Sequence, residues 1–279
     1  SVRILLAEDN PINQKVALGH LRELGYSADV AGTGLEVLQA LETKTYEIIF
    51  MDCQMPELDG YETTRRIRAR HPTGPTGPRI IAMTAHAMRG DREKCLEAGM
   101  DDYISKPVQD HELVAALNRR APSETPEASA GFEPSRNGAV GTPASSPAPD
   151  LPRSEPAPVD LERLRKVTFG DDAGLAELVQ MFLEQADGTL QELEKALEDN
   201  SAESVERLAH RLCGASSTCG MIGLLPPLRA LENRGHERQL AGAQALWLET
   251  AAQLEKIKAF LAEYSRSNDK PALTLTNSN

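Results

Sequence analysis

Short apolar runs alternate with longer amphipathic stretches over the first 120 residues. The apolar runs have the length of β-strands, and each stretch between them is long enough for a helix. A strand followed by a helix, repeated along the segment, predicts a parallel sheet that is covered by helices on both faces. The expected strands are residues 4–7, 28–30, 48–51, 80–83 and 102–104.

Residues that start and stop helices support this division. Asn10 followed by Pro11 is typical of an N-cap and a first helical position. Gly25 and Gly99 fit the positions just after the ends of the first and fourth helices, where left-handed backbone is common.

From about residue 159 the strand pattern disappears, and apolar residues recur at helical spacing. Short connections between these stretches predict an antiparallel helical bundle. The expected helices cover residues 160–168, 172–198, 202–218, 221–235 and 239–264. The fold class is therefore α/β plus all-α.

A Pro-, Ala- and Ser-rich segment separates the two halves. Residues 121–158 hold nine of the 18 prolines and a single aromatic residue, Phe132, so they cannot bury enough apolar surface to fold. We expect a first domain at 1–120, a disordered linker at 121–158, a bundle at 159–264 and a flexible tail at 265–279. A flexible chain of the linker's length spans roughly 35 Å, which predicts tethered encounters between the domains and not a fixed unit.

The charge balance excludes several classes of function. With 42 acidic and 30 basic residues the net charge is −12, which disfavours nucleic acids and anionic membranes as partners. Since no run approaches ~20 apolar residues and no signal-peptide pattern is visible, we expect a cytoplasmic chain without direct membrane contact. The chain begins with Ser1 and not with Met, so we expect it to be a piece of a longer protein. Disulfides and structural zinc are not expected, because no CxxC motif occurs among Cys53, Cys95, Cys213 and Cys219.

Polar residues follow the strands of the expected sheet at the edge where their carboxyl ends meet. Glu8 and Asp9 follow the first strand, Asp52 the third, Thr84 the fourth and Lys106 the fifth. Three carboxylates at one edge repel one another unless a cation lies among them, and an all-oxygen site suits Mg²⁺.

A phosphoryl group would complete such a site. Asp52 could attack phosphorus as a carboxylate nucleophile, while Lys106 pairs with the phosphoryl charge and Thr84 donates a hydrogen bond. The simpler alternative makes Asp9 a charge at a helix N-terminus and Asp52 a loop solubiliser. The alignment of all these residues at strand ends favours the phosphoryl site.

The motifs at these strand ends resemble those of the response-regulator receiver domain, in the subtype found in hybrid sensor histidine kinases. The resemblance covers residues 1 to about 120 and implies a flavodoxin-like (βα)5 fold. It implies that Asp52 is the phosphoacceptor and that Mg²⁺ is held by Glu8, Asp9, Asp52 and the backbone carbonyl of Gln54. It also implies that Thr84, Tyr103 and Lys106 respond to phosphorylation. The Lys106–Pro107 peptide is implied to be cis. The motifs are Leu6-Ala7-Glu8-Asp9-Asn10, Met51-Asp52-Cys53-Gln54-Met55-Pro56-Glu57-Leu58-Asp59-Gly60, Met83-Thr84-Ala85-His86-Ala87 and Tyr103-Ile104-Ser105-Lys106-Pro107.

One histidine of the bundle stands out from the apolar pattern. On the expected helix 202–218, the buried stripe is formed by Val205, Leu208, Leu212, Ala215 and Cys219. His210 lies outside that stripe, and Gly214 one turn later leaves room for another molecule. An exposed imidazole beside such a clearing is a candidate phosphoryl carrier, with a solvated surface histidine as the simpler alternative. Its expected neighbours on the outer face are Glu203, Glu206, Arg207, Cys213, Gly214 and Ser217.

This helix resembles the phosphorylation helix of histidine-containing phosphotransfer (HPt) domains. The resemblance covers residues 159 to about 264 and implies that His210 is phosphorylated. The family usually has a lysine where Cys213 stands, which puts the stability and transfer rate of phospho-His210 in question; Arg207 and Arg211 are candidate substitutes. The motifs are Ala209-His210-Arg211-Leu212-Cys213-Gly214-Ala215-Ser216-Ser217, ending at Gly220, and Leu228-Arg229-Ala230-Leu231-Glu232.

The remaining histidines have no acidic or hydroxyl residue at catalytic spacing in the sequence. We therefore expect them to be surface or interface residues. They are His20, His71, His86, His111 and His236.

These observations predict a phosphorelay module that receives a phosphoryl group on Asp52 and carries it on His210. The expected partners are the phosphodonor domain of a histidine kinase, upstream in the same polypeptide or separate, and a downstream receiver domain. No ATP-binding domain is recognised, so whether the chain counts as an enzyme stays open, and a hybrid histidine kinase with an upstream membrane anchor is the expected parent. One alternative is a receiver with a binding-only adaptor bundle, in which Cys213 marks weakened transfer. Another is a phosphatase-like hydrolase, which ranks last because Gln54 stands where a second Asp is needed.

Overall fold

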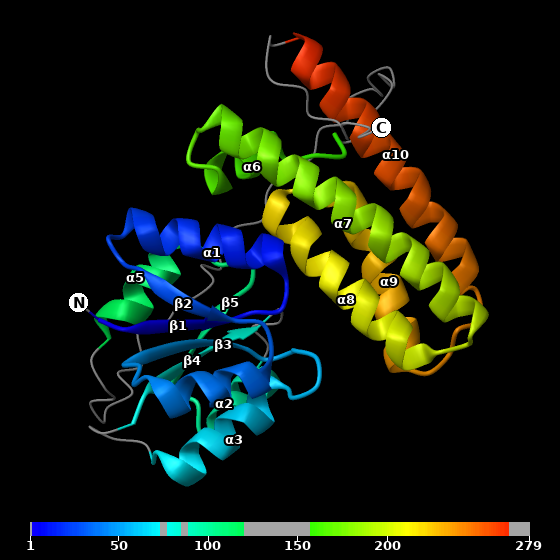
Figure 1. Ribbon diagram of the computed structural model, residues 1–279. Coiled ribbons are helices and arrows are strands. Elements are labelled where there is room, and N and C mark those ends of the chain that lie inside the picture. The colour runs from blue at the N-terminus through cyan, green and yellow to red at the C-terminus, as the bar shows by residue number, and fades with distance from the viewer. Residues whose placement is uncertain (1, 73–76, 85–88, 120–156, 268–279) are drawn as a thin grey trace, which may run out of the picture.

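The computed structural model describes residues 2–72, 77–84, 89–119 and 157–267. They form a sheet domain and a helical bundle that lie side by side (Figure 1). The expected linker falls outside the described residues except for Ala157 and Pro158, and the expected tail does so from residue 268 onward.

The first domain is a five-stranded parallel sheet with the strand order β2-β1-β3-β4-β5. This confirms the predicted α/β domain, although four of the five strands are longer than expected. The strands are β1 (Ile4–Ala7), β2 (Ala28–Ala31), β3 (Ile48–Asp52), β4 (Arg79–Thr84) and β5 (Asp102–Ser105). The helices are α1 (Pro11–Glu23), α2 (Gly34–Thr43), α3 (Gly60–Arg70), α4 (Arg89–Glu97) and α5 (Asp110–Asn118).

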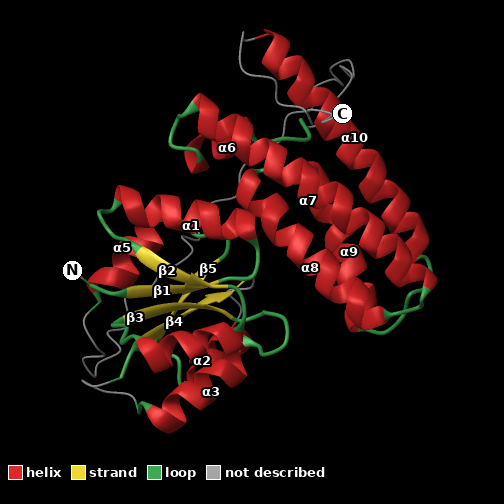
Figure 2. Cartoon of the chain, in the orientation of Figure 1, coloured by secondary structure: helices red, strands yellow, loops and turns green. Residues whose placement is uncertain are grey.

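Helices cover both faces of this sheet (Figure 2). Because side chains alternate across a strand, Leu6 and Phe50 face α1 and α5, whereas Leu5 and Ile49 face α2, α3 and α4. The central strands β1 and β3 are therefore buried on both sides, and the polar residues that they carry or precede lie at their carboxyl ends.

The helix boundaries follow the expected local rules. The Asn10 side chain accepts a hydrogen bond from the amide of Ile12 at 2.9 Å, and Pro11 is the first residue of α1. Gly25 and Gly99 have φ values of 83° and 97°, which confirms their left-handed positions after α1 and α4.

The second domain is the predicted helical bundle. Its last helix starts later than expected, after Gly242 with a φ of 79°. It also ends later than expected, at Ser267, and Ser265 in its last turn is buried. The expected helix 221–235 is divided, because a short 3₁₀ turn at Ile222–Leu224 precedes the prolines that start the next helix. The helices are α6 (Leu161–Val167), α7 (Asp172–Glu198), α8 (Ala202–Cys219), α9 (Leu225–His236) and α10 (Ala243–Ser267).

The two domains meet along α1, which contacts α6, α7 and α8 (Figure 1). Ile12 and Val16 of α1 belong to the same buried cluster as the bundle core. The Nζ atom of Lys15 lies 2.6 Å from the Glu177 carboxylate at the edge of this contact. The structure thus shows the domains docked, and the expectation of tethered encounters between two domains that do not form a fixed unit stays a prediction.

No helix within the described ranges is both long and apolar enough to span a lipid bilayer.

Candidate functional site

The expected acidic residues meet at the carboxyl edge of the sheet. Glu8 and Asp9 follow β1, Asp52 ends β3, and their carboxylate oxygens lie within 4.8 Å of one another. Glu8 and Asp52 are only 2% and 3% exposed. The Nζ atom of Lys106, which follows β5, lies 2.6 Å from both the Glu8 and the Asp52 carboxylate. The Lys106–Pro107 peptide is cis, as predicted.

The electrostatics of this edge favour an additional cation. Burial raises the pKa of Asp52; the charge of Lys106 opposes this, and the neighbouring Glu8 adds to it. Burial and Glu8 likewise raise the pKa of Asp9. Burial by itself would lower the pKa of Lys106, but Asp52 and Glu8 outweigh it and raise that pKa. Lys106 and, 4.0 Å from Asp9, the guanidinium of Arg211 thus offset three carboxylates only in part, and this all-oxygen cluster fits a divalent cation such as Mg²⁺.

The other expected residues of the first domain lie on β4 and β5 or shortly after β3. Thr84 is buried at the end of β4, and Tyr103 of β5 packs against the core beneath α2, α3 and α4. The backbone amide of Gln54 donates a hydrogen bond to Asp52 at 3.1 Å. The expected role of the Gln54 carbonyl as a metal ligand stays a prediction.

In the bundle, His210 is held by a residue to which the sequence had assigned no role. The side chain of His210 is 21% exposed, and its Nδ1 lies 2.7 Å from the carboxylate of Glu232 on α9. An ionised carboxylate only accepts hydrogen bonds, so it favours the tautomer that carries the proton on Nδ1. The Nε2 lone pair is then available for chemistry. The register between α8 and α9 decides this pairing, and periodicity within either helix does not reveal it.

The expected position of Cys213 on an open outer face is wrong. α9 covers this part of α8, which leaves Cys213 only 9% exposed and in contact with Arg229. Burial, followed by the charge of Glu232, raises the pKa of its thiol, and Arg229 opposes that shift. The first domain approaches Gly214, where a Cβ atom would lie 3.6 Å from the side-chain nitrogen of Asn13, an ordinary contact distance; the expected role of this glycine stays a prediction.

The two expected substitute cations lie in different surroundings. Arg207 is exposed and is not among the residues that line the cavity beside His210. Arg211 does line that cavity, and its Nε lies 4.0 Å from Asp9. The carbonyl of Arg211 also accepts a hydrogen bond from Asn10 at 3.2 Å.

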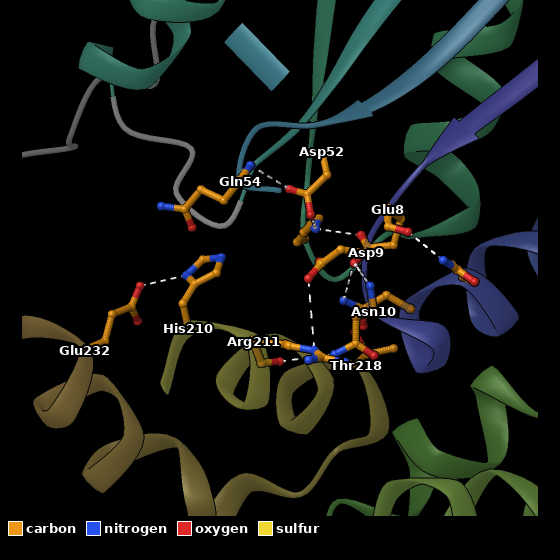
Figure 3. A network of polar contacts seen from close by, with 12 residues as sticks. Glu8, Asp9, Asn10, Asp52, Gln54, His210, Arg211, Thr218 and Glu232 are labelled. Carbon is orange, nitrogen blue, oxygen red and sulfur yellow. Dashed lines mark hydrogen bonds and ion pairs between the residues drawn. The ribbon is translucent and has the colours of Figure 1, made fainter. Parts of the chain in front are cut away.

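A cavity of about 300 Å³ between the domains contains both candidate phosphorylation sites. The first domain contributes Asp9, Asp52 and Lys106 to its lining, and the bundle contributes His210, Arg211, Arg229 and Glu232. Figure 3 shows the His210 ring on the side of the bundle that faces Asp52, with Glu232 behind it. A hydrogen bond of 2.8 Å from the Thr218 hydroxyl to Asn13 links the domains at the same boundary.

Two of the remaining histidines have acidic partners, and both lie where the sequence predicted: His20 at the interface with the bundle and His236 on the surface. His20 is 2% exposed, and its Nδ1 contacts the carboxylate of Asp110, so it has the acidic partner that linear spacing did not reveal. His236 pairs with Glu206 at 2.9 Å. His71 and His111 are exposed, as expected, and His86 lies outside the described residues.

Comparisons with known proteins find matches for both halves of the chain. Residues 4–118 match the model of the response regulator receiver domain, and residues 177–263 match the model of the Hpt domain. The sensor histidine kinase GacS of Pseudomonas protegens is 29% identical over 264 residues, which cover 93% of this chain and 25% of GacS. The hybrid signal transduction histidine kinase K of Dictyostelium discoideum is 44% identical over 121 residues, which cover 42% of this chain and 10% of the kinase.

Solved structures match the first domain. One is the receiver domain of the sensor histidine kinase PA1611 from Pseudomonas aeruginosa, determined with a magnesium ion in its active-site cleft. It is 45% identical, and the match covers 42% of this chain and 94% of that one with a TM-score of 0.37. The chain itself spans only a tenth to a quarter of the curated kinases above.

Proposed function

We propose that this chain, which is a response-regulator receiver domain followed by an Hpt domain, passes a phosphoryl group between Asp52 and His210. The two domains make it a phosphorelay module of two-component signalling. The observation that carries the proposed transfer is the shared cavity, which is lined by Asp52 from one side and His210 from the other.

The geometry supports a direct displacement at phosphorus. In the direction from Asp52 to His210, the Nε2 lone pair attacks the phosphorus of the aspartyl phosphate. The bond from phosphorus to the Asp52 oxygen breaks, and its electron pair returns to the carboxylate. Nδ1 keeps its proton throughout, and the adjacent Glu232 stabilises the positive charge that the ring gains. The reverse transfer retraces these steps, with neutral imidazole as the leaving group.

The acidic edge is proposed to hold Mg²⁺ through Glu8, Asp9, Asp52 and the carbonyl of Gln54. Bound there, the ion supplies positive charge to the phosphoryl oxygens and to the attacking carboxylate. Lys106 lies within reach of the same oxygens, because its Nζ is already 2.6 Å from Asp52. We propose that Thr84 and Tyr103 respond to the phosphorylated state, as the resemblance implies.

We propose Arg229 as the cation that serves in place of the lysine usual at position 213. Its guanidinium contacts the Cys213 side chain, and it lines the cavity together with His210. Arg229 on α9 thus reaches the same region that the side chain of a lysine at position 213 on α8 would reach. Arg211 is less suited to this role, because its Nε lies toward Asp9.

The docked arrangement also bears on how phosphoryl groups enter. The bundle covers the edge at which Asp52 lies, so a kinase phosphodonor domain needs the bundle to move aside before it reaches Asp52. We propose that such a donor, in a hybrid kinase or a separate protein, phosphorylates Asp52, and that phospho-His210 serves a downstream receiver. Release and redocking of the bundle would allow both steps.

A binding-only adaptor remains the second candidate, because Cys213 replaces the usual lysine. It predicts that phosphate stops at Asp52, and a labelling experiment therefore decides between the two.

The experiment incubates the full chain with radiolabelled acetyl phosphate and Mg²⁺, then separates base-labile aspartyl phosphate from acid-labile histidyl phosphate. We expect both kinds in the natural chain, only aspartyl phosphate in His210→Gln, and neither in Asp52→Asn. Aspartyl phosphate alone in the natural chain would favour the adaptor. Histidyl phosphate in Asp52→Asn would mean that His210 does not depend on Asp52.

A further inference from the structure

A second contact joins the domains away from the phosphotransfer cavity. Phe169 lies in the turn between α6 and α7 of the Hpt domain, and its ring reaches Gly19 on α1 of the receiver domain. A Cβ atom built on Gly19 would lie 2.6 Å from Cε2 and 3.2 Å from Cζ of this ring. The phenyl ring therefore occupies the space that any other side chain at position 19 would need.

The neighbouring His20 completes the seat for the ring. The rings of His20 and Phe169 meet edge to face, with centroids 5.2 Å apart and an interplanar angle of 77°. His20 is 2% exposed and contacts Asp110 of α5 through Nδ1, so its ring has a fixed orientation. The receiver thus offers a surface that fits the Phe169 ring, because Gly19 has no side chain and the His20 ring is held in place.

The turn presents Phe169 at an energetic cost. Phe169 has a φ of 54°, a left-handed conformation that bulky residues rarely adopt. Hydrogen bonds from its amide to Lys166 and from the Gly170 amide to Arg165, each 3.1 Å, hold the turn. The ring remains 39% exposed, so it contributes little to the bundle core. Packing of the ring against α1 accounts for the left-handed conformation of Phe169.

Ile12 and Val16 of α1 pack on the bundle core as well, whereas two polar contacts between the domains are more tolerant of shape. The hydrogen bond from Asn10 to the Arg211 carbonyl and the ion pair of Lys15 with Glu177 involve flexible polar groups that can adjust. The contact at Gly19 is steric, and it depends on the absence of a side chain.

We propose that Phe169 is a specificity-determining residue that selects the receiver domain of its own chain. A receiver with no side chain at the position of Gly19 seats the ring and brings its aspartate to His210, whereas a receiver with a larger residue there is held away. This inference rests on the proposed transfer between Asp52 and His210, and it adds which receiver the Hpt domain accepts.

The test uses the full chain and three variants. Gly19→Leu places a side chain against the ring, and Gly19→Leu with Phe169→Ala removes the obstacle again. Gly188→Leu is the matched control, because a Cβ atom on this α7 glycine meets nothing within 4 Å. Each protein receives a pulse of acetyl phosphate with Mg²⁺, and the rate at which histidyl phosphate forms from aspartyl phosphate is measured at several protein concentrations.

We expect Gly19→Leu to slow the transfer about tenfold or more, because overpacking a contact is costly. Gly188→Leu stays within about twofold of the natural chain, and the double variant recovers most of the lost rate. All proteins load Asp52 equally, which shows that the receiver domain is folded. The transfer rate does not depend on protein concentration, because the receiver and the bundle belong to one chain.

Three results would overturn the inference while leaving the proposed transfer intact. They are an unchanged rate in Gly19→Leu, a slow rate that removal of the Phe169 ring does not restore, and a rate that rises with protein concentration. If the natural chain forms aspartyl phosphate and no histidyl phosphate, the proposed function fails instead, and the labelling pattern separates these cases.

Discussion

The two proposed phosphorylation sites are built in opposite ways. Asp52 is 3% exposed and belongs to an edge where residues from several strands already face one another. His210 lies on one helix, is 21% exposed and, among the residues that the structure describes, has Glu232 as its hydrogen-bond partner. The receiver therefore supplies a site that is already assembled. The Hpt domain supplies the oriented imidazole of His210, and the remaining groups of the proposed reaction come from the receiver. Under the proposed transfer, this division means that the bundle needs no metal site of its own.

The largest expected effect concerns the preassembled site. Asp52→Asn should reduce phosphate uptake from acetyl phosphate at least about a thousandfold, because an amide is a poor nucleophile. Chelation of Mg²⁺ should do the same to the natural chain. Asp199→Asn, at an exposed position after α7, is the control and should label normally. Substantial labelling of Asp52→Asn would move the acceptor elsewhere.

The crowded carboxylates should also weaken the fold when no cation is present. A carboxyl group whose pKa is raised by folding stabilises the folded state when protonated. That contribution is complete below the unfolded-state pKa of ~4 and is lost as the pH rises through the folded-state value. Because the pKa of Asp52 is raised even though Lys106 pairs with it, Asp52→Asn should increase the free energy of unfolding at neutral pH in chelator.

Added Mg²⁺ should remove this advantage, since the natural carboxylate then gains a partner. Chemical denaturation of both proteins with and without Mg²⁺ measures the difference. Equal stability in chelator, or an equal response to Mg²⁺, would contradict the assigned cation site.

The simpler site depends on the tautomer of His210. Glu232→Gln should slow phosphoryl transfer about tenfold, because an amide no longer fixes the proton on Nδ1 or stabilises ring charge. Glu206→Gln is a close control. The Glu206 carboxylate lies 2.9 Å from Nδ1 of His236, which is the same kind of contact, and neither residue lines the cavity. Stopped-flow or quenched transfer rates compare the variants, and equal slowing in both would refute a specific role for Glu232.

The smallest expected effect is on the half-life of phospho-His210, and it concerns Cys213, which stands where the family usually has a lysine. Arg229→Ala should shorten the half-life of phospho-His210 about threefold, and Cys213→Lys should lengthen it modestly, because a nearby cation stabilises the phosphoryl charge. Arg207→Ala, at an exposed position outside the cavity lining, should leave the half-life unchanged. A half-life that responds to Arg207 and not to Arg229 would reverse this assignment.

The same contrast explains what the sequence reveals. Asp52, Thr84 and Lys106 could be placed together because parallel strands end at one edge, and Cys219 and Leu212 could be placed in the core from helical spacing. Glu232, Arg229 and the burial of Cys213 depend on how α9 lies across α8, which the pattern of either helix alone does not determine.

The docking of the two domains was less predictable still. Polar and small residues of α1, such as Asn13 and Gly19, show no pattern that marks them as contacts of another domain. The pairing of His20 with Asp110 links residues 90 positions apart, beyond the reach of local spacing. Contacts of this kind follow from tertiary packing and not from periodicity.

A single-turnover time course tests the central claim most directly. The full chain is loaded on Asp52 with a brief pulse of acetyl phosphate and Mg²⁺, the donor is removed, and both phosphates are followed. The account predicts that histidyl phosphate appears as aspartyl phosphate disappears, with one shared rate that does not change on dilution. Loss of aspartyl phosphate to free phosphate, without histidyl phosphate, would contradict it.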